Sequence, residues 1–98
     1  MRFQFEDSDL SRLYYEDNNR GNYPEYVVNA FFKKMQIIRG AKNENDIRAI
    51  KSNHFEKLTG EHNRYSIRLN DQYRLIFSIE KDEICKLILI KEISNHYS

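Results

Sequence analysis

The sequence contains very little cysteine, proline or glycine: one Cys, one Pro and three Gly among 98 residues. The single cysteine, Cys85, excludes an internal disulfide and suits a reducing compartment. Seven Tyr and six Phe supply large apolar side chains, which argues against disorder. Because a chain of this length buries one compact core, we expect a single domain over residues 1–98.

Long hydrophobic runs are also missing. Residues 1–9 lack the apolar stretch of a secretion signal, and no segment is long and apolar enough to cross a bilayer. We therefore expect a cytoplasmic protein with no membrane partner. No carboxylate or cysteine lies at ligand spacing from His54, His62 or His96, so we expect no metal site. No glycine-rich phosphate loop or Ser/Cys nucleophile motif is present, and we expect no cofactor.

The charge is nearly balanced overall, at +1, but it is unevenly distributed. Residues 1–30 carry three basic and six acidic side chains, whereas residues 48–74 carry six basic and three acidic ones. A locally basic middle attracts phosphate groups. An ordinary solvated charged face is the alternative interpretation of the same pattern.

The first half of the chain has the pattern of helices. Asp7 or Ser8 can cap a short helix that ends at residues 18–21. Pro24 suits the first turn of a second helix, and Gly40 is a natural end for it. The apolar residues of this second helix recur at helical spacing: Val27, Val28, Phe31, Phe32, Met35 and Ile38. Asn43 can cap a third, shorter helical segment that runs to about residue 50.

After His54 the hydrophobic period changes to two, which is typical of strands. The runs cover residues 65–69, 73–79 and 84–93, with turns at residues 70–72 and 80–83. The third run is apolar on both faces toward its start, which favours a more central strand. Short turns imply antiparallel neighbours. We therefore predict an α+β fold in which two to three N-terminal helices pack on one face of a small twisted antiparallel sheet.

The turn at residues 70–72 can be closed in two registers. A two-residue loop would set Arg68 against Leu75 and mix charged with apolar residues on both faces. An odd-length loop sets Leu69 against Tyr73 and makes one face wholly apolar, so this register should win. It also sets Arg68 directly opposite Arg74, with Arg64 and Ser66 nearby. Two such arginines need an anionic partner, which a carboxylate or a phosphate could supply.

Several polar side chains flank this predicted hairpin in sequence. His54 and Lys57 precede its first strand, and the last strand ends with Asn95, His96 and Tyr97. That strand should run beside a hairpin strand, which could bring His96 and Tyr97 toward the arginines. A histidine, a phenol and fixed positive charge are the groups that metal-free RNA cleavage needs. The alternative is that the chain-end residues are solvent-exposed and have no role.

Three segments together resemble one known family. Residues 54–60 (HFEKLTG), 65–77 (YSIRLNDQYRLIF) and 92–97 (EISNHY) are similar to the HigB toxins of the RelE/ParE superfamily. The resemblance implies a RelE-like fold of helices on a twisted antiparallel sheet. Many members also have an N-terminal strand, which residues 2–5 could supply.

The resemblance also implies an activity and its partners. HigB-type toxins cut mRNA on the translating ribosome without a metal, by attack of the 2′-OH on the adjacent phosphate. A HigA-type helix-turn-helix antitoxin neutralises them, and operator DNA is bound only through that complex. Two other functions stay open: a ParE-like toxin that targets gyrase, and a non-catalytic co-repressor that acts with its antitoxin.

The roles of individual residues follow from the same resemblance. Arg74 matches the strand arginine that RelE-like enzymes use at the scissile phosphate. His96 and Tyr97 resemble the terminal pair of the YoeB-like branch, and His54 matches a catalytic histidine of some HigB toxins. The resemblance thus implies that these four are catalytic. The residues expected to bind RNA or phosphate are Arg68, Arg64, Lys57 and Asn95.

Overall fold

The computed structural model describes residues 1–18, 20–81 and 83–95. The helical elements are α1 (Ser8–Glu16), η1 (Arg20–Asn22), α2 (Glu25–Gly40), α3 (Glu44–Arg48) and η2 (Lys51–Asn53). The strands are β1 (Arg2–Phe5), β2 (Glu56–Lys57), β3 (Tyr65–Arg68), β4 (Tyr73–Lys81) and β5 (Lys86–Asn95). The predicted order of helices followed by strands is confirmed, with one strand added before the helices.

The helices begin at the capping residues that the sequence indicates. The side chain of Asp7 accepts hydrogen bonds from the backbone N–H groups of Asp9 and Leu10, so it satisfies two of the free donors of α1. Pro24 stands immediately before α2, where its missing N–H costs nothing. Asn43 caps α3 by accepting from the N–H of Asn45. Local chemistry thus sets where each helix starts.

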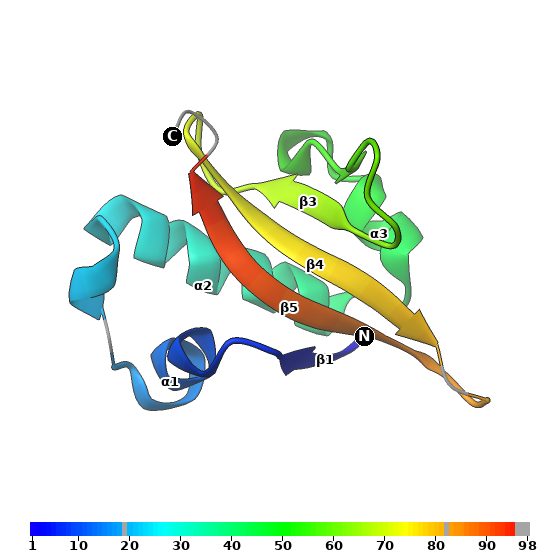
Figure 1. Ribbon diagram of the computed structural model, residues 1–98, viewed down its shortest axis with the longest axis horizontal. Helices are drawn as coiled ribbons and strands as arrows, with labels where there is room; N and C mark the ends of the chain where they lie inside the picture. Colours follow the sequence, from blue (N-terminus) through cyan, green and yellow to red (C-terminus); the bar gives the residue numbers. More distant parts are fainter. Residues whose placement is uncertain (19, 82, 96–98) are drawn as a thin grey trace.

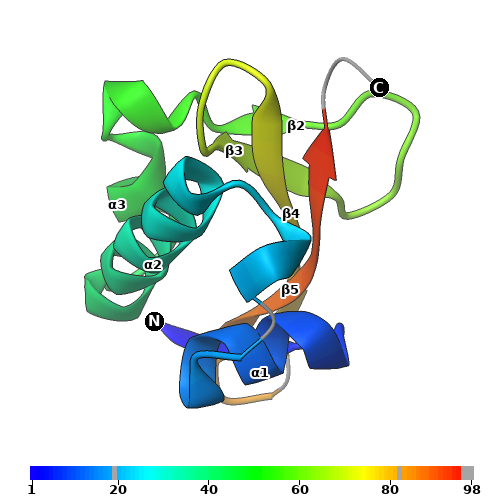
Figure 2. The same ribbon diagram turned by 90° about the vertical axis from the view of Figure 1, so that its left-hand side faces the viewer.

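The five strands form one sheet in the order β1-β5-β4-β3-β2. Figures 1 and 2 show α2 and α3 on one side of β3, β4 and β5, and α1 beside β1. The α+β prediction is confirmed, and β5 is internal to the sheet as expected. The sheet is antiparallel except for β1, which pairs with β5 in parallel. Because β1 and β5 stand at opposite ends of the chain, no tight turn dictates an antiparallel pairing between them.

The hairpin of β3 and β4 has the register that keeps one face apolar. Ile67 pairs with Leu75, Tyr65 with Phe77, and Arg68 with Arg74. The turn is closed by the N–H of Leu69, which donates to the carbonyl of Tyr73. The prediction of an odd-length loop and of opposed arginines is therefore confirmed.

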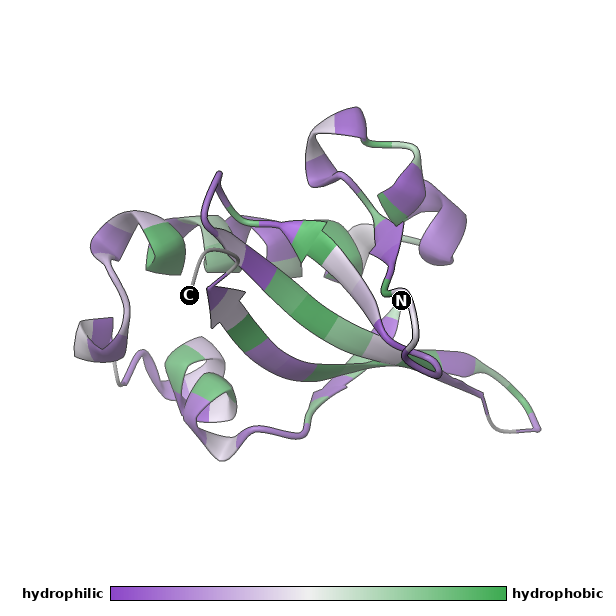
Figure 3. Ribbon diagram, turned by 45° about the horizontal axis from the view of Figure 1, so that its top comes forward, coloured by the Kyte–Doolittle hydropathy of each residue, from purple (hydrophilic) through white to green (hydrophobic). Residues whose placement is uncertain are grey.

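The core lies between the helices and one face of the sheet. It contains Leu10 and Leu13 of α1 and the apolar stripe of α2, packed against Ile67, Leu75 and Phe77 of the hairpin. Hydrophobic residues occupy the middle of β4, whereas the connecting loops are mainly hydrophilic (Figure 3). None of the helices in the described part of the chain is long and apolar enough to cross a membrane.

Candidate functional site

The sheet brings three side chains into one row on the face opposite α2 and α3. Arg68 of β3 pairs with Arg74 of β4, and Arg74 pairs in turn with Ser94 of β5. Ser66 and Ile76 form the next row. We call Ser66, Arg68, Arg74 and Ile76 the arginine face of the hairpin. This face follows directly from the register of the hairpin, because the same register places the alternate residues, such as Ile67 and Leu75, in the core.

Arg74 is held by neutral acceptors. Its Nε donates to Ser66 Oγ at 2.8 Å, and one of its Nη atoms donates to the backbone carbonyl of His54 at 2.6 Å. Its side chain is only 15% exposed. Neutral acceptors fix the plane of a guanidinium without cancelling its charge. The site therefore contains an oriented cation with further N–H donors to offer.

Carboxylates also surround the arginines. Asp71 in the turn pairs with Arg68, and Glu56 of β2 lies 3.9 Å from Arg74. That separation is within ion-pair range but beyond a hydrogen bond. Each of the two opposed arginines thus has a carboxylate partner. A carboxylate was one of the two anionic partners expected from the sequence, the other being a phosphate. The partner of Arg74 is the weaker of the two contacts.

Arg64 stabilises the same face from the side. Its side chain lies 3.0 Å from Glu61 and 3.6 Å from Glu92. Because β4 lies between β3 and β5, this contact reaches over β4. Ile76 and Ser78 of β4 are 5% and 1% exposed. Arg64 is thus already paired with two carboxylates, one of them on β5.

His54 enters the site through its backbone. It follows η2 in the left-handed conformation, with φ of 44°, which is unfavourable for a residue with a side chain. Its carbonyl is the acceptor for Arg74, and its side chain is exposed. The next residue, Phe55, packs its ring against Tyr65 and Phe77 at centroid distances of 5.6 and 5.9 Å.

Two of the predicted RNA-binding residues occupy register positions on the other side of the sheet. Lys57 pairs with Tyr65 and Asn95 pairs with Tyr73, and both tyrosines pack against the core. Side chains of paired residues share a face, so neither residue lies on the arginine face. His96 and Tyr97 lie outside the described residues.

Some residues of the site were not found from the sequence. Glu56 belongs to a two-residue edge strand, which leaves no periodic pattern to detect. Lys34 is 7% exposed on the buried side of α2 and donates to Asn53 Oδ1 at 2.5 Å. Burial lowers the pKa of Lys34, and the positive charges of Lys33 and Arg68 lower it further. Its spacing from Phe31 and Ile38 could have indicated a buried position.

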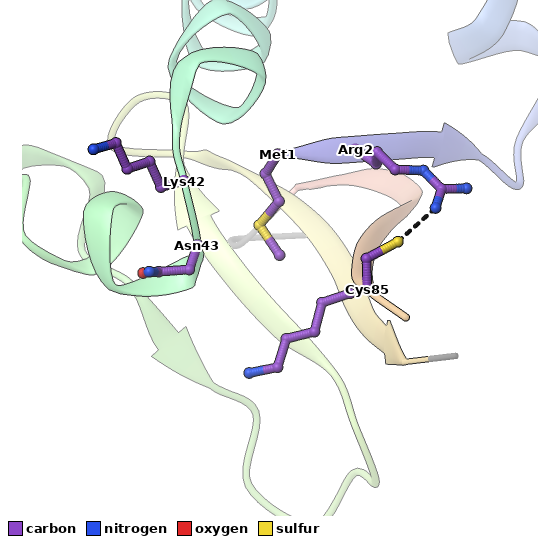
Figure 4. Close-up of a pocket in the computed structure, with 6 residues that line it drawn as sticks. Met1, Arg2, Lys42, Asn43 and Cys85 are labelled. Carbon is purple, nitrogen blue, oxygen red and sulfur yellow. Dashed lines mark hydrogen bonds between the residues drawn. The ribbon is translucent and has the colours of Figure 1, made fainter. Parts of the chain in front are cut away.

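A separate pocket lies at the other end of β5. Its cavity is about 320 Å³ and is lined by Met1, Arg2, Lys42, Asn43, Cys85 and Lys86. Arg2 donates a hydrogen bond to Cys85 Sγ (Figure 4), and Lys86 pairs with Glu44 at 2.7 Å. Ser94 lies eight positions after Lys86 along β5, which is roughly 25 Å at the usual rise. The pocket is thus distinct from the arginine face. Within the described residues, no group of three or more His, Cys, Asp or Glu side chains is arranged to hold a metal ion.

Comparison of folds supports the architecture. A YoeB/ParE toxin from Agrobacterium tumefaciens superposes with a TM-score of 0.58, covering 99% of this chain and 100% of that one. The sequence identity is 12%, so this likeness concerns the fold alone.

Sequence comparisons identify the family. The chain is 40% identical over 78 residues to Toxin HigB-1 of Vibrio cholerae serotype O1, covering 79% of this chain and 82% of that protein. It is 36% identical over 89 residues to an uncharacterized protein of Haemophilus influenzae, covering 90% and 88%. A family described as "RelE-like toxin of type II toxin-antitoxin system HigB" matches residues 3–91, a range that includes Arg68 and Arg74 but not His96 and Tyr97. The chain therefore belongs to the HigB-like toxin family of type II toxin–antitoxin systems.

Proposed function

We propose that this toxin is an endoribonuclease that cuts mRNA on the translating ribosome and so inhibits translation. One observation carries the proposal: Arg74 is a largely buried guanidinium oriented by Ser66 and the carbonyl of His54. Within the described residues, two of its five N–H groups donate hydrogen bonds, and both acceptors are neutral. The remaining donors suit the oxygens of a phosphate, whose negative charge grows as the 2′-OH attacks.

The proposed reaction needs no redox partner or cofactor. The 2′-oxygen forms a bond to the adjacent phosphorus, its proton passes to a base, and the 5′-oxygen leaves with a proton from an acid. The products are a 2′,3′-cyclic phosphate and a free 5′-OH. Arg74 and Arg68 would stabilise the anionic transition state. Arg64, already paired with two carboxylates, would contact RNA only at the edge of the site.

We assign the proton transfers to His96, with Tyr97 stacking on or polarising the substrate and with His54 and Lys57 assisting. The support is one of chain connectivity. Ser94 pairs with Arg74 and Asn95 ends β5 beside Tyr73, so His96 and Tyr97 are the next two residues of the chain after the end of the sheet that holds Arg74. In this proposal Lys57 approaches RNA from the edge strand β2 and Asn95 from the end of β5.

Membership of a toxin–antitoxin family supports an antitoxin as the partner. We propose that a HigA-type helix-turn-helix antitoxin neutralises the toxin, that the complex binds operator DNA through the antitoxin, and that the toxin acts in the cytoplasm. Copurification with the product of a neighbouring helix-turn-helix gene would test the first step.

The test is to induce the wild type, Arg74→Ala and His96→Ala and to map mRNA ends. Arg12→Ala is the matched control, because Arg12 is an exposed arginine of α1 whose one ion pair within residues 1–18, 20–81 and 83–95 is with Asp9. We expect the wild type and the control to cut within translated codons. Both site variants should lose about a hundredfold or more in rate, the usual cost of removing a group that stabilises the transition state. Cutting at the same positions by both site variants would refute the assignment.

One observation favours a second function. Each opposed arginine already has a carboxylate within 4 Å, as expected for a structural ion-pair network on a non-catalytic co-repressor. A chain that is harmless when expressed alone, but still represses with its antitoxin, would establish this function. Gyrase-linked DNA breaks with intact mRNA would instead establish a ParE-like activity.

A further inference from the structure

A lysine is buried beneath the site, and no carboxylate of the described residues pairs with it. Lys34 lies on the buried side of α2, between Phe31 and Ile38, and is 7% exposed. Among the described residues its side chain makes no ion pair, and its hydrogen bond goes to the amide oxygen of Asn53 at 2.5 Å. A buried ammonium normally requires a counter-charge or strong hydrogen bonds. An apolar residue would fill this position at lower cost, so the charge needs an explanation.

The hydrogen bond is the first link of a chain that ends at Arg74. Asn53 is fully buried and donates from Nδ2 to the carbonyl of Ile47 at 3.0 Å. Lys34 and Asn53 therefore tie α2, η2 and the end of α3 together. The residue after Asn53 is His54, whose carbonyl accepts from Arg74 at 2.6 Å.

His54 requires such support because its backbone is strained. A left-handed φ of 44° persists in a histidine only where the surroundings hold it. Phe55 is held on one side of His54 by its ring contacts with Tyr65 and Phe77. Asn53 is held on the other side by Lys34 and Ile47. The orientation of the His54 carbonyl thus depends on both neighbouring residues. Phe55 is held by packing of its ring, and Asn53 is held by hydrogen bonds.

We infer that Lys34 is a positioning residue: its buried ammonium fixes Asn53, and through it the His54 carbonyl that orients the Arg74 guanidinium. The inference deepens the proposed function and rests on it for the effect on RNA cleavage. The orienting effect of Lys34 concerns only the Nη side of the Arg74 guanidinium, which the His54 carbonyl contacts. The Nε side is held by Ser66 of β3, whereas the hydrogen bond of Lys34 goes to Asn53.

The test compares Lys34→Met with Met35→Ala in the full chain. Met35 is the next residue of α2 and is fully buried in the apolar core, so its truncation removes core volume but leaves both groups of the Lys34–Asn53 hydrogen bond in the chain. Exchange of the Arg74 side-chain N–H groups is followed by ¹⁵N NMR, with Arg74→Lys used for assignment. In Lys34→Met the Nη protons should exchange about tenfold faster, as for a local opening, while Nε–H stays within about twofold. In Met35→Ala both groups should stay as in the wild type.

Cleavage of mRNA on programmed ribosomes gives the second readout. Lys34→Met should lower the maximal rate about tenfold or more with little change in half-saturating concentration, because a slightly misplaced group affects the transition state most. The maximal rate of Met35→Ala should stay within about threefold of the wild-type rate, measured at a temperature well below the melting points of both proteins. If the wild type cuts no RNA, the proposed function fails, while the NMR comparison still decides the positioning role.

The inference is overturned if folded Lys34→Met keeps the Nη protection of Arg74, or if Nη and Nε lose protection together. It is also overturned if Met35→Ala gives the same pattern. Should Lys34→Met not fold, the double variant Lys34→Met/Asn53→Leu serves instead, because it leaves no unpaired polar side chain and the Ile47 carbonyl keeps the N–H of Ile50. Wild-type Nη protection in that variant would be equally decisive against it.

Discussion

The two faces of the β3–β4 hairpin are built by alternate residues of the same two strands but depend on different parts of the chain. The core face consists of Tyr65, Ile67, Leu75 and Phe77, and it is covered by the helices. No helix of the described residues covers the arginine face (Figure 2), and its charged groups are paired with segments from loops and from the edge strand. One face is therefore stabilised by burial of area, and the other by individual polar contacts.

This difference teaches which kind of change each face tolerates. Apolar packing is non-directional, so the core face needs volume and can accept another side chain of similar size. Hydrogen bonds and ion pairs are directional, so the arginine face fails when one partner moves. We expect mutations on the core face to act mainly on stability and mutations on the arginine face to act mainly on function.

The largest effect is expected from Phe77→Ala on the core face. Phe77 is fully buried and stacks on Tyr65 at a centroid distance of 6.0 Å. Its truncation leaves a cavity and should lower the free energy of unfolding by about 3–5 kcal/mol. Urea denaturation followed by circular dichroism measures the loss. Ile76→Ala truncates the preceding residue of β4, which lies on the arginine face. If Phe77→Ala loses no more stability than Ile76→Ala, the proposed difference between the two faces is wrong.

The same contrast separates what sequence alone can predict. The register of the hairpin was predictable because only one pairing buries Ile67 and Leu75 on the same face. The helix starts at Asp7 and Asn43 were predictable because capping is local. The neutral acceptors of Arg74 were not predictable, because the His54 carbonyl reaches it through the path of η2 and a two-residue edge strand. The parallel pairing of β1 likewise depends on tertiary packing.

A second, smaller effect is expected from Ser66→Ala. Ser66 is fully buried and accepts from Arg74 Nε, so the variant leaves a charged donor partly unsatisfied and should cost about 1–3 kcal/mol. Ser78→Ala is the matched control: its hydroxyl is also buried, but it donates to Glu80, an exposed residue that water can solvate. Equal losses in chemical denaturation would mean that the Arg74 contact has no special value.

A third effect concerns pH and links the two faces through Lys34. Its pKa is lowered from 10.5 by burial and by the charges of Lys33 and Arg68. Between the lowered pKa and 10.5 the unfolded chain binds more protons than the folded protein, so stability should rise with pH in that window. Relative to Lys34→Met, the free energy of unfolding of the wild type should therefore increase with pH. The slope should be below the one-proton limit of about 1.4 kcal/mol per pH unit.

Melting temperatures of the two proteins from neutral to alkaline pH measure this difference. Other lysines and tyrosines titrate in both proteins and cancel in the comparison. Arg68→Gln removes one of the charges that lower the pKa of Lys34, so the window should narrow in that variant. A difference that falls as pH rises would contradict the buried charged state of Lys34.

The smallest effect, and the one that sharpens the comparison most, is expected from Glu56→Gln. Glu56 is the only carboxylate that the described residues place within ion-pair range of Arg74, and at 3.9 Å and 60% exposure the pair adds little stability. Removing it should leave the melting temperature unchanged but raise affinity for an uncleavable 2′-O-methyl RNA by about two- to fivefold, because phosphate no longer competes with a carboxylate. The gain should shrink as salt screens the site. Glu16→Gln is the control variant, because it changes the net charge by the same amount at an exposed position at the end of α1. An equal gain in that variant would reduce the effect to net charge, whereas a gain confined to Glu56→Gln would show that Arg74 is the cation that meets RNA.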